Sequence, residues 1–312
     1  MNPLAAALLV AAKRLGWIIL TLWAVYTFSF FLMRAVPGGP FSAEKKVQPA
    51  VQRQLEARFH MDEPIPLQYL RSLASAALWL DFGPSMRLED YTVNEVIAQG
   101  FPVSASLGVI ALVLALLFGM TAGVISAVKR NSIFDFSFML MATVGIAVPN
   151  FVLASLAIIL LVFWLQLVPA AGWGSVQQLF LPALCIAAPY AAYIARLTRA
   201  GMLEVLNLDY IRTAYAKGLA PRTVVVKHAL RGGILPVVSY LGPATAGILT
   251  GSLVLERIFN IPGMGSHFID AAIQRDYTLA LGMVVVYTLL LLVMNTLVDL
   301  SYAIIDPRVK VE

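Results

Sequence analysis

Long apolar stretches without charge alternate with short polar stretches along most of the chain. The uncharged stretches cover residues 15–33, 101–128, 136–195, 232–255 and 277–298. A bilayer core of about 30 Å takes about 20 helical residues to cross, so four of these stretches each predict one membrane-spanning helix. The third is far longer, and LVPAAGWGSVQQLFLPAL from Leu167 places turn residues in its middle. The pattern therefore predicts six transmembrane helices.

Composition supports an all-α integral membrane protein. The 312 residues are 60% apolar and 12% charged, whereas an average soluble protein has about 25% charged residues. Lys13 and Arg14 precede the first apolar stretch, as they would in a secretory signal, but the stretch exceeds the usual core of about 7–15 residues. RAVPGGP follows it in place of a small-x-small cleavage site. We therefore expect an uncleaved anchor.

Lys and Arg are unevenly divided between the two sides of the membrane. With six spans, both termini, the connection after residue 128 and the loop 196–231 share one side, which carries thirteen Lys or Arg and five Asp or Glu. The opposite side carries nine and eleven. Basic residues favour the cytoplasmic side, so we expect the termini and this loop to be cytoplasmic. The net charge of +5 then reflects topology and gives no reason to expect nucleic acid.

The segment 34–100 lies on the other side and predicts short amphipathic helices. Apolar residues recur at helical spacing after Pro49 and again after the breakers Pro64 and Pro66. DFGPS from Asp81 predicts a turn, and Thr92 with Glu95 predicts a capping box that opens a helix toward the second span. Two roles stay open for this segment: a lid on the bundle or lipid surface, and a docking site for an extracytoplasmic partner.

The sequence carries none of the common catalytic signatures. A phosphate-binding loop, an H-E-x-x-H zinc helix and a G-x-S-x-G nucleophile turn are all missing from it. His60, His228 and His267 fall on opposite sides of the membrane in the expected topology, so we expect no metal site. Cys185 is the single cysteine, which excludes a disulfide within the chain. We expect a protein that is not an enzyme and binds no cofactor itself.

Several features of the spans suit either helix packing or a transport path. The G-x-x-x-G pairs at Gly119 and at Gly247 let helix backbones approach closely, and ordinary packing explains them. Broken helices at membrane depth are tolerated where they face protein or a watery cavity, and an intramembrane carboxylate is a functional candidate. On these grounds the candidate pathway or gate residues are Pro149 and Asn150, expected to interrupt the third span, Gly242 and Pro243, expected to interrupt the fifth, and Asp299.

The polar loop carries the most specific pattern, EVLNLDYIRTAYAKGLAPRTVVVKHALRGGILPVVSYLGP from Glu204. It resembles the cytoplasmic loop of ABC importer permeases of the dipeptide, oligopeptide and nickel class, B-type subunits. FFLMRAVPGGPF, FPVSASLG, AVKRNSIFD, ERIFNIPGMGSHFIDAAIQRDY and VDLSYAIIDPRVK extend the resemblance over nearly the whole chain. The compact connection between the third and fourth spans, together with DFGPS and DYTVNE, is most similar to the oligopeptide type.

The resemblance implies a type I ABC importer permease fold. Residues 1–33 would hold the N-terminus and first span, 34–100 the extracytoplasmic segment, 101–306 a five-span core with the coupling loop 196–231, and 307–312 a cytoplasmic tail. A short coupling helix in this loop would fit a groove on a cytoplasmic ATPase. The residues themselves agree, since 212–217 can form a short helix that Gly218 ends. The candidate ATPase-coupling residues are Tyr210, Arg212, Thr213, Ala214, Ala216, Lys217, Gly218, His228 and Arg231.

The loop departs from the general importer pattern, EAA-x-x-x-G followed nine residues later by I-x-L-P. Arg212, Thr213 and Ala214 stand in place of EAA, and the later positions hold His228, Leu230 and Arg231. The peptide-class B-type subunits resemble this chain in that variation. Arg212 nevertheless reverses the charge of the acidic position, so a carboxylate contact with the ATPase cannot be carried over.

The resemblance also implies the partners. These would be a homologous C-type permease subunit in a heterodimer, two cytoplasmic ATPase subunits that bind ATP and Mg, an extracytoplasmic peptide-binding protein, the peptide and the lipid of a bacterial inner membrane. Transport would proceed by alternating access. Import of dipeptides, nickel chelates or peptide-like antibiotics by the same fold stays open. An intramembrane enzyme or an autonomous channel is disfavoured, because the spans lack a catalytic dyad and the loop lacks an ATP site.

Overall fold

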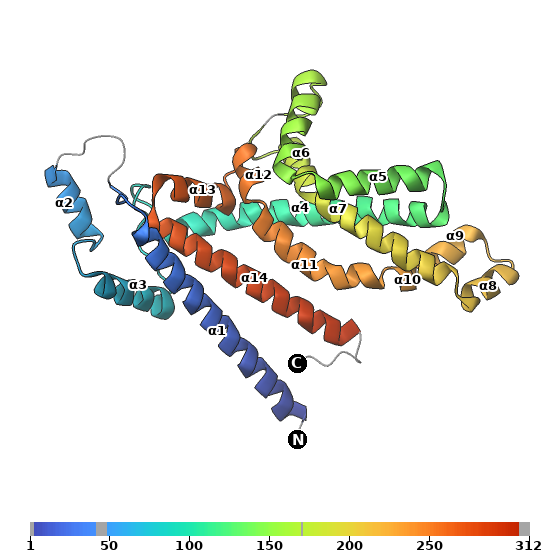
Figure 1. Cartoon of the computed structure of the whole chain (residues 1–312), viewed down its shortest axis with the longest axis horizontal. Coiled ribbons are helices and arrows are strands. Elements are labelled where there is room, and N and C mark those ends of the chain that lie inside the picture. Colours follow the sequence, from blue (N-terminus) through green and yellow to red (C-terminus); the bar gives the residue numbers. More distant parts are fainter. Residues whose placement is uncertain (1–2, 42–48, 170, 306–312) are drawn as a thin grey trace. The chain divides into compact units, whose positions relative to one another are not determined.

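The computed structural model describes residues 3–41, 49–169 and 171–305, and every regular element in them is a helix (Figure 1). The chain divides into two compact units. Among the described residues, the first unit holds those up to Val103 together with Pro262–Val293, and the second holds Ser104–Ile261 and those from Met294 to Ile305. The long helices α4, Val93–Val128, and α14, Tyr277–Ile305, each contribute to both units.

In the first unit, three helices precede α4. They are α1, Pro3–Ala35, α2, Pro49–Arg58, and α3, Ile65–Trp79; α13, Met264–Gln274, leads into α14. The two helices predicted after Pro49 and Pro64 are thus confirmed. Proline is well suited to the first turn of a helix, where its missing N–H has no intrahelical partner. The predicted capping box is also present, because the Thr92 N–H donates to Glu95 Oε2 at 2.8 Å and the Glu95 N–H donates to Thr92 Oγ1 at 3.2 Å.

Two apolar clusters form the core of this unit. One joins the start of α4 to α13 and α14 through Val93, Met264 and Met283. The other joins α1, α3 and α14 through Tyr26, Phe30, Ala76 and Leu281. Gly282 of α14 lets this helix lie close to the start of α4, because a Cβ at that position would be 2.5 Å from the Val93 side chain.

A cluster of hydrogen-bonded polar groups around Asp276 joins segments of the first unit that are distant in sequence. The buried Asp276 carboxylate accepts hydrogen bonds from the Ser85 hydroxyl, the Arg87 N–H at 3.2 Å and the Leu279 N–H at 3.0 Å. The Arg87 guanidinium in turn donates to the carbonyl of Pro40. RAVPGGPF, DFGPS and QRDY, three motifs of the family resemblance, therefore meet in one place.

In the second unit, the other helices surround α7, Val176–Leu206. The elements before α7 are α5, Ile133–Ala147, α6, Asn150–Ala157, and the π-helical segment η1, Ile158–Trp164. The elements after it are α8, Asp209–Ala216, α9, Pro221–Thr223, the π-helical segment η2, Val224–Ala229, α10, Leu230–Gly233, α11, Leu235–Gly251, and α12, Leu253–Ile258. Helices α5, α6, α10 and α11 all pack on α7.

Glycine permits the close approach of α4 to α7. A Cβ on Gly119 would lie 2.6 Å from the Ala191 carbonyl oxygen, and one on Gly123 would lie 2.6 Å from that of Ala195. A Cβ on Gly247 of α11 would likewise lie 2.6 Å from the Tyr190 hydroxyl of α7. Tight helix packing, the ordinary interpretation of these glycines, is confirmed.

Five helices are long and apolar enough to cross a membrane, and a sixth candidate is the pair α5 and α6–η1. That pair bends by 111° at Pro149, where the sequence predicts an interruption. Proline at this point caps α6, and residue 148, which precedes it, takes an extended conformation. The six predicted spans thus become five helices and one sharply bent pair, counted by length and composition over the described residues.

The predicted interruption at Gly242 and Pro243 is wrong. Helix α11 runs through both residues, and the helix boundaries lie instead at Ile234 and Ser252. A proline inside a helix removes one hydrogen bond and bends the axis, and neighbouring helices in a membrane bundle compensate for that loss. Gly242 is buried in this packing. The backbone of Asp299 belongs to α14, but its side chain lies outside the described part of the structure.

Candidate functional site

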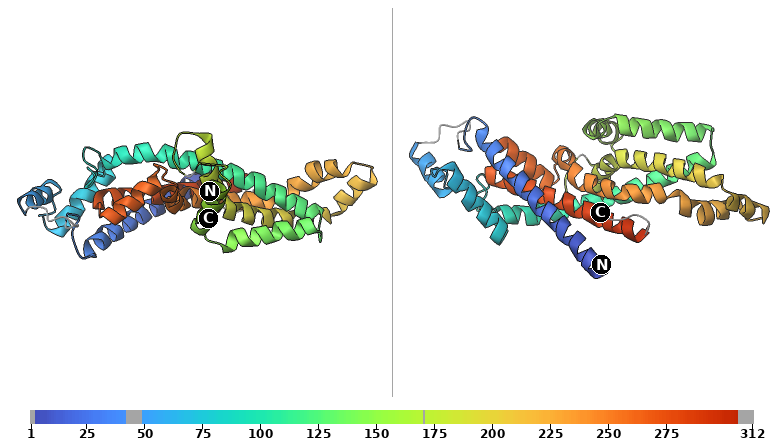
Figure 2. Two further views of the ribbon diagram at one scale, coloured as in Figure 1. Left: turned by 90° about the horizontal axis from the view of Figure 1, so that it is seen from above. Right: turned by 60° about the horizontal axis from the view of Figure 1, so that its bottom comes forward.

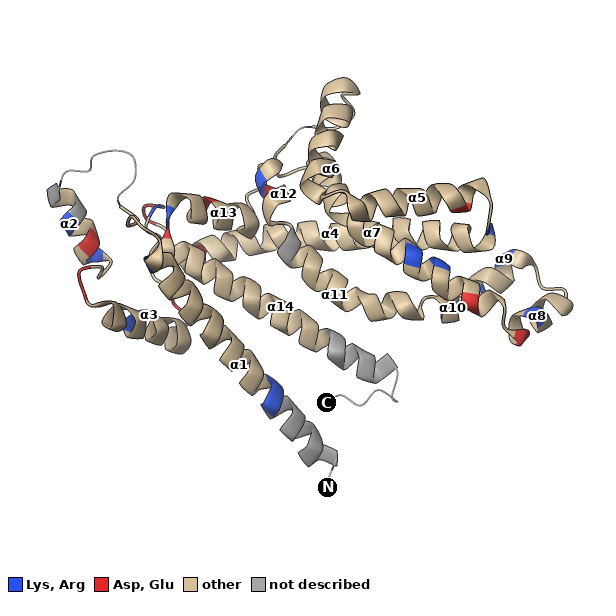
Figure 3. Ribbon diagram, in the orientation of Figure 1, with Lys and Arg blue, Asp and Glu red and all other residues tan. Residues whose placement is uncertain are grey.

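A helical hairpin extends from the end of α7, formed by α8, α9, η2 and α10. Figure 3 shows basic residues gathered on these helices and on the last turns of α7. Helix α8 is short and strongly amphipathic. Ile211 and Ala214, three positions apart, are buried against Met202 and Val205 of α7 and against Val224 and Val225 of η2. This packing fixes the orientation of α8.

The opposite face of α8 is exposed. Tyr210 and Tyr215 lie on the two edges of the buried face, next to Ala214 and Ile211 around the helix, and their side chains are 48% and 44% exposed. Leu208 and Leu219 flank the helix at 45% and 37%. Arg212, Thr213, Ala216 and Lys217 are exposed between them. The Arg212 guanidinium lies 3.6 Å from the Asp209 carboxylate with both groups well exposed, and such a pair contributes little. The outward face therefore presents small and basic side chains, with a half-exposed tyrosine on each edge.

Gly218 ends α8, as the sequence predicts. Its φ of +79° is left-handed, a conformation in which glycine has no Cβ to clash. The Gly218 N–H donates to the Tyr215 carbonyl at 2.9 Å and the Leu219 N–H donates to the Ala214 carbonyl at 3.3 Å. These two bonds form a Schellman motif, which satisfies the last carbonyls of the helix and reverses the chain sharply.

One candidate coupling residue needs correction. Ala214 is only 6% exposed and belongs to the cluster beneath α8, so it faces the chain's own core and is not available to a partner. An eight-residue helix has too little intrinsic stability to form alone, and Ala214 with Ile211 supplies the contact that holds it.

The remaining candidates divide into two groups. Tyr210, Arg212, Thr213, Ala216, Lys217 and Gly218 share the exposed side of α8 and its end, whereas His228 and Arg231 are exposed on the returning limb. The other candidates lie away from the hairpin: Pro149 in the break between α5 and α6, Asn150 at the start of α6, and Gly242 and Pro243 on α11. Whether any of these residues contacts a partner or lines a path stays a prediction.

The sequence analysis missed a buried ion pair near the hairpin. The Arg199 guanidinium on α7 donates to both carboxylate oxygens of Asp135 on α5, at 2.7 and 2.9 Å. Asp135 also accepts the Asn131 N–H at 2.9 Å and the Ser126 hydroxyl. The carboxylate side chain is 7% exposed. The network ties the turn between α4 and α5 to the helix that carries α8.

The only sequence signal for this pair is a single acid, Asp135, at the edge of an apolar stretch. Charged groups are rarely buried unless they are paired, so a carboxylate at the edge of an apolar stretch is expected to have a basic side chain as its partner. Arg199 is 64 positions away, and no local spacing links the two.

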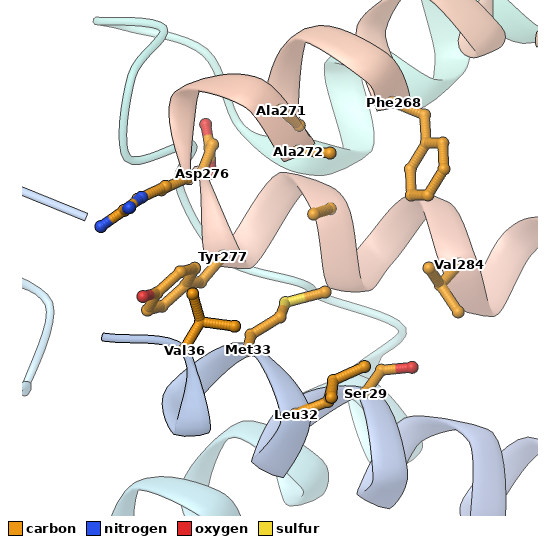
Figure 4. Close-up of a pocket in the computed structure, with 12 residues that line it drawn as sticks. Ser29, Leu32, Met33, Val36, Phe268, Ala271, Ala272, Asp276, Tyr277 and Val284 are labelled. Carbon is orange, nitrogen blue, oxygen red and sulfur yellow. The ribbon is translucent and has the colours of Figure 1, made fainter. Parts of the chain in front are cut away.

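The first unit contains an apolar cavity of about 350 Å³ bounded by α1, α13 and α14. Figure 4 shows Leu32, Met33, Phe268 and Val284 around it. Asp276 lies at its edge, but its carboxylate is engaged by Ser85 and Arg87. The lining offers shape and apolar surface and no group poised for proton transfer. Among the described residues, no group of three or more His, Cys, Asp or Glu is placed to hold a metal ion.

Comparison with known proteins shows which protein family carries these features. Residues 119–311 match the model of the family described as binding-protein-dependent transport system inner membrane component. The chain is 46% identical over 298 residues to the dipeptide transport system permease protein DppB of Bacillus subtilis, covering 96% of each chain. It is 43% identical over 300 residues to the oligopeptide transport system permease protein OppB of Haemophilus influenzae, covering 96% of this chain and 98% of the relative.

A solved structure supports the same fold. The chain matches a crystal structure of an amino acid ABC transporter with histidines, with a TM-score of 0.53 and 15% sequence identity. The match covers 67% of this chain and 93% of the other. At this identity the likeness concerns the fold alone.

Proposed function

Because the chain belongs to the family of binding-protein-dependent transport system inner membrane components, we propose that it is the permease subunit of an ATP-driven peptide importer. It is a multi-pass membrane protein, with five candidate spans and one bent pair. We propose a bacterial inner membrane location with both termini in the cytoplasm, which the distribution of Lys and Arg supports. The chain would form half of the pathway beside a homologous C-type permease.

The exposed face of α8 carries this proposal. Ile211 and Ala214 fix a short helix from below, and Gly218 ends it sharply. Small and basic residues face outward, and a half-exposed tyrosine lies on each edge. Aromatic side chains on an exposed, rigid element are typical anchors of protein contacts. Such a helix suits a groove on a cytoplasmic ATPase, and the ATP and Mg would be bound by two ATPase subunits.

In the proposed mechanism, a binding protein delivers peptide to the outer face. ATP-driven closure of the ATPases would displace α8, and the rigid connection of α8 to α7 would pass that displacement to the spans. A pathway between the two permeases would then open outward and inward in alternation. This chain supplies the path and the mechanical contact, without a catalytic group.

Short peptides are the cargo class we propose. The relatives are named for dipeptide and for oligopeptide transport, and the compact connection before α7 favours the oligopeptide type. Uptake of labelled di-, tri- and tetrapeptides by cells with and without this gene distinguishes the two cargoes. Loss of dipeptide uptake alone would reassign the cargo within the family.

Copurification from membranes tests the assembly. The tagged chain should bring down a second permease and two ATPase subunits. Tyr210→Asp should reduce the recovered ATPase severalfold, because it places a charge on the exposed face of α8. Tyr91→Asp is the matched control, since Tyr91 is exposed to a similar degree, 45% against 48%, in the segment 34–100.

Two results would contradict the proposal. Peptide transport by the purified chain alone would assign it to autonomous carriers. Equal ATPase recovery with Tyr210→Asp and with wild type would show that α8 does not form the contact with the ATPase.

A further inference from the structure

An exposed apolar patch ends α3. Its three consecutive residues, Leu78, Trp79 and Leu80, are 74%, 79% and 71% exposed. The chain carries no charge from Ser72 to Leu80, and charge returns at Asp81. Such a run of large apolar side chains is unfavourable in water, so another apolar medium or partner must cover it.

The helix that carries this patch lies along a candidate span. Helices α1 and α3 lie side by side in Figures 1 and 2. Side-chain hydrogen bonds join them at three residue pairs: Arg34 to Gln68 at 3.1 and 3.0 Å, Thr27 to Tyr69 at 2.8 Å, and Tyr26 to Ser72. Residues 26 and 34 are about 12 Å apart along α1 at 1.5 Å per residue. Helix α3 therefore follows α1 from its last turn into its apolar stretch.

The apolar surface of α1 continues onto α3. On α1, Phe28, Phe31 and Leu32 are 69%, 45% and 52% exposed, and in a span such side chains face lipid. The Phe31 ring stacks on Tyr69 of α3 with centroids 5.5 Å apart. Beyond Tyr69, Leu73 and Ala76 pack inward with Tyr26, so this side of α3 is held against α1 as far as its last turn. On its other side Leu67 and Leu70 are 46% and 59% exposed. The end of α3 is thus fixed beside the apolar stretch of a candidate span.

The backbone of Leu80 gives a second, independent indication. Its φ of 51° and ψ of 31° are left-handed, at the C-cap of α3, where glycine is usual. The Asn94 side chain donates to the Leu80 carbonyl at 2.7 Å and holds this conformation. The strained position thus presents a large side chain outward with no burial in the chain to offset the strain. Hydrocarbon outside the chain would supply that burial.

We propose that Leu78, Trp79 and Leu80 form a lipid anchor that inserts into the interfacial layer of the bilayer. Tryptophan concentrates at this layer because its ring is apolar and its N–H is polar. Amphipathic helices bury their apolar face about 5–10 Å into the same layer. The anchor holds the segment 34–100 against the membrane surface. It does not depend on the cargo or on the ATPase contact.

Site-specific fluorescence tests the anchor. In a Cys185→Ala background, Trp79→Cys carries an environment-sensitive dye in the full chain, reconstituted in phosphatidylglycerol and phosphatidylethanolamine liposomes with its copurifying partners. We expect iodide in the buffer to quench this dye at least about threefold less than a dye at Ala57→Cys on α2, because the interfacial layer excludes the anion. Lipids spin-labelled near the glycerol should quench the dye at 79 and leave that at 57 unaffected.

Leu78→Cys provides a second position, in case Trp79→Cys fails to assemble, and should give the same result. Iodide quenching at 78 and 79 as strong as at 57 would overturn the anchor. Protection from iodide without quenching by spin-labelled lipid would also overturn it, because a protein partner would then cover the patch.

Discussion

At the scale of single residues, the paired charges Asp135 and Arg199 set the geometry around the hairpin. Removing one partner of a buried pair leaves the other charge uncompensated, which costs far more than the pair itself contributes. The Arg199 side chain is 28% exposed, so water relieves part of that cost. The pair therefore acts mainly as a positional constraint between α5 and α7.

Asp135→Asn should lower the stability of the detergent-solubilised protein by about 3 kcal/mol, since the Arg199 guanidinium then lacks a counter-charge. Asp209→Asn is the control, because this carboxylate is 97% exposed and its loss should change little. Thermal unfolding followed by tryptophan fluorescence measures both. Similar melting temperatures for the two variants would contradict a constraining role for Asp135.

At the scale of elements, α4 and α7 depend on the absence of side chains between them. The carbonyl of Ala195 occupies the place of a Cβ on Gly123, and a backbone atom cannot move aside as a side chain can. Helix propensity alone favours alanine over glycine by about 1 kcal/mol. Packing and propensity therefore oppose each other at this residue.

Gly123→Ala should destabilise the protein by about 1–3 kcal/mol, because overpacking outweighs the gain in propensity. Gly16→Ala on α1 should be neutral or stabilising by up to about 1 kcal/mol, since no atom lies within 4 Å of its Cβ position. Only Gly123→Ala should lower the melting temperature. A stabilising Gly123→Ala would refute the close contact.

The end of α8 offers a test of the mechanical role. A Cβ at Gly218 would meet no atom within 4 Å, so the cost of a β-branched residue there comes mainly from the left-handed backbone, about 1–2 kcal/mol. Gly218→Val should therefore leave membrane insertion intact and raise the ATP hydrolysed per peptide imported. Gly218→Asn should raise the ATP hydrolysed per peptide by less, because asparagine tolerates the left-handed conformation better than valine does.

Gly174→Val is the matched control for that experiment. Gly174 has a φ of +123° and equally open surroundings, but it lies in the connection before α7. The ratio of ATP to peptide should stay near that of wild type in this variant. Unchanged uptake and ratio with Gly218→Val at normal expression would argue against the coupling role of α8.

At the scale of the whole molecule, charge determines the orientation that we propose. The α8 hairpin and the connection after α4 concentrate Lys and Arg (Figure 3), whereas the segment 34–100 mixes acids and bases. Basic loops are retained on the cytoplasmic side during insertion. The hairpin is therefore expected on the ATPase side.

In a Cys185→Ala background, Lys217→Cys should react with a membrane-impermeant maleimide only in inverted vesicles. Ala57→Cys should react only in intact, outer-permeabilised cells. Both positions are exposed, so burial cannot account for a difference. Labelling of Lys217→Cys in intact, outer-permeabilised cells would contradict the proposed orientation and place the hairpin on the outer side.

Much of the local structure follows from short-range patterns. The uncharged stretches predict where the long helices lie, Pro149 predicts the break between α5 and α6, and Gly218 predicts the end of α8. Each depends on neighbours within one or two helical turns. Gly242 and Pro243 show the limit of such patterns, because the same breaker residues leave α11 continuous when the surrounding bundle supports it.

Hydrophobicity, charge and turn chemistry are properties of adjacent residues, so the amino-acid sequence was enough to predict the membrane class, the approximate spans, the charge asymmetry and the family resemblance. The packed fold was needed to show that Ala214 faces inward, that Arg199 pairs with Asp135, and that Asp276 joins Ser85 across 191 positions. It alone placed α3 along α1 and left its apolar end exposed. These outcomes depend on which surfaces meet after the helices pack, and no local pattern encodes the identity of a distant partner.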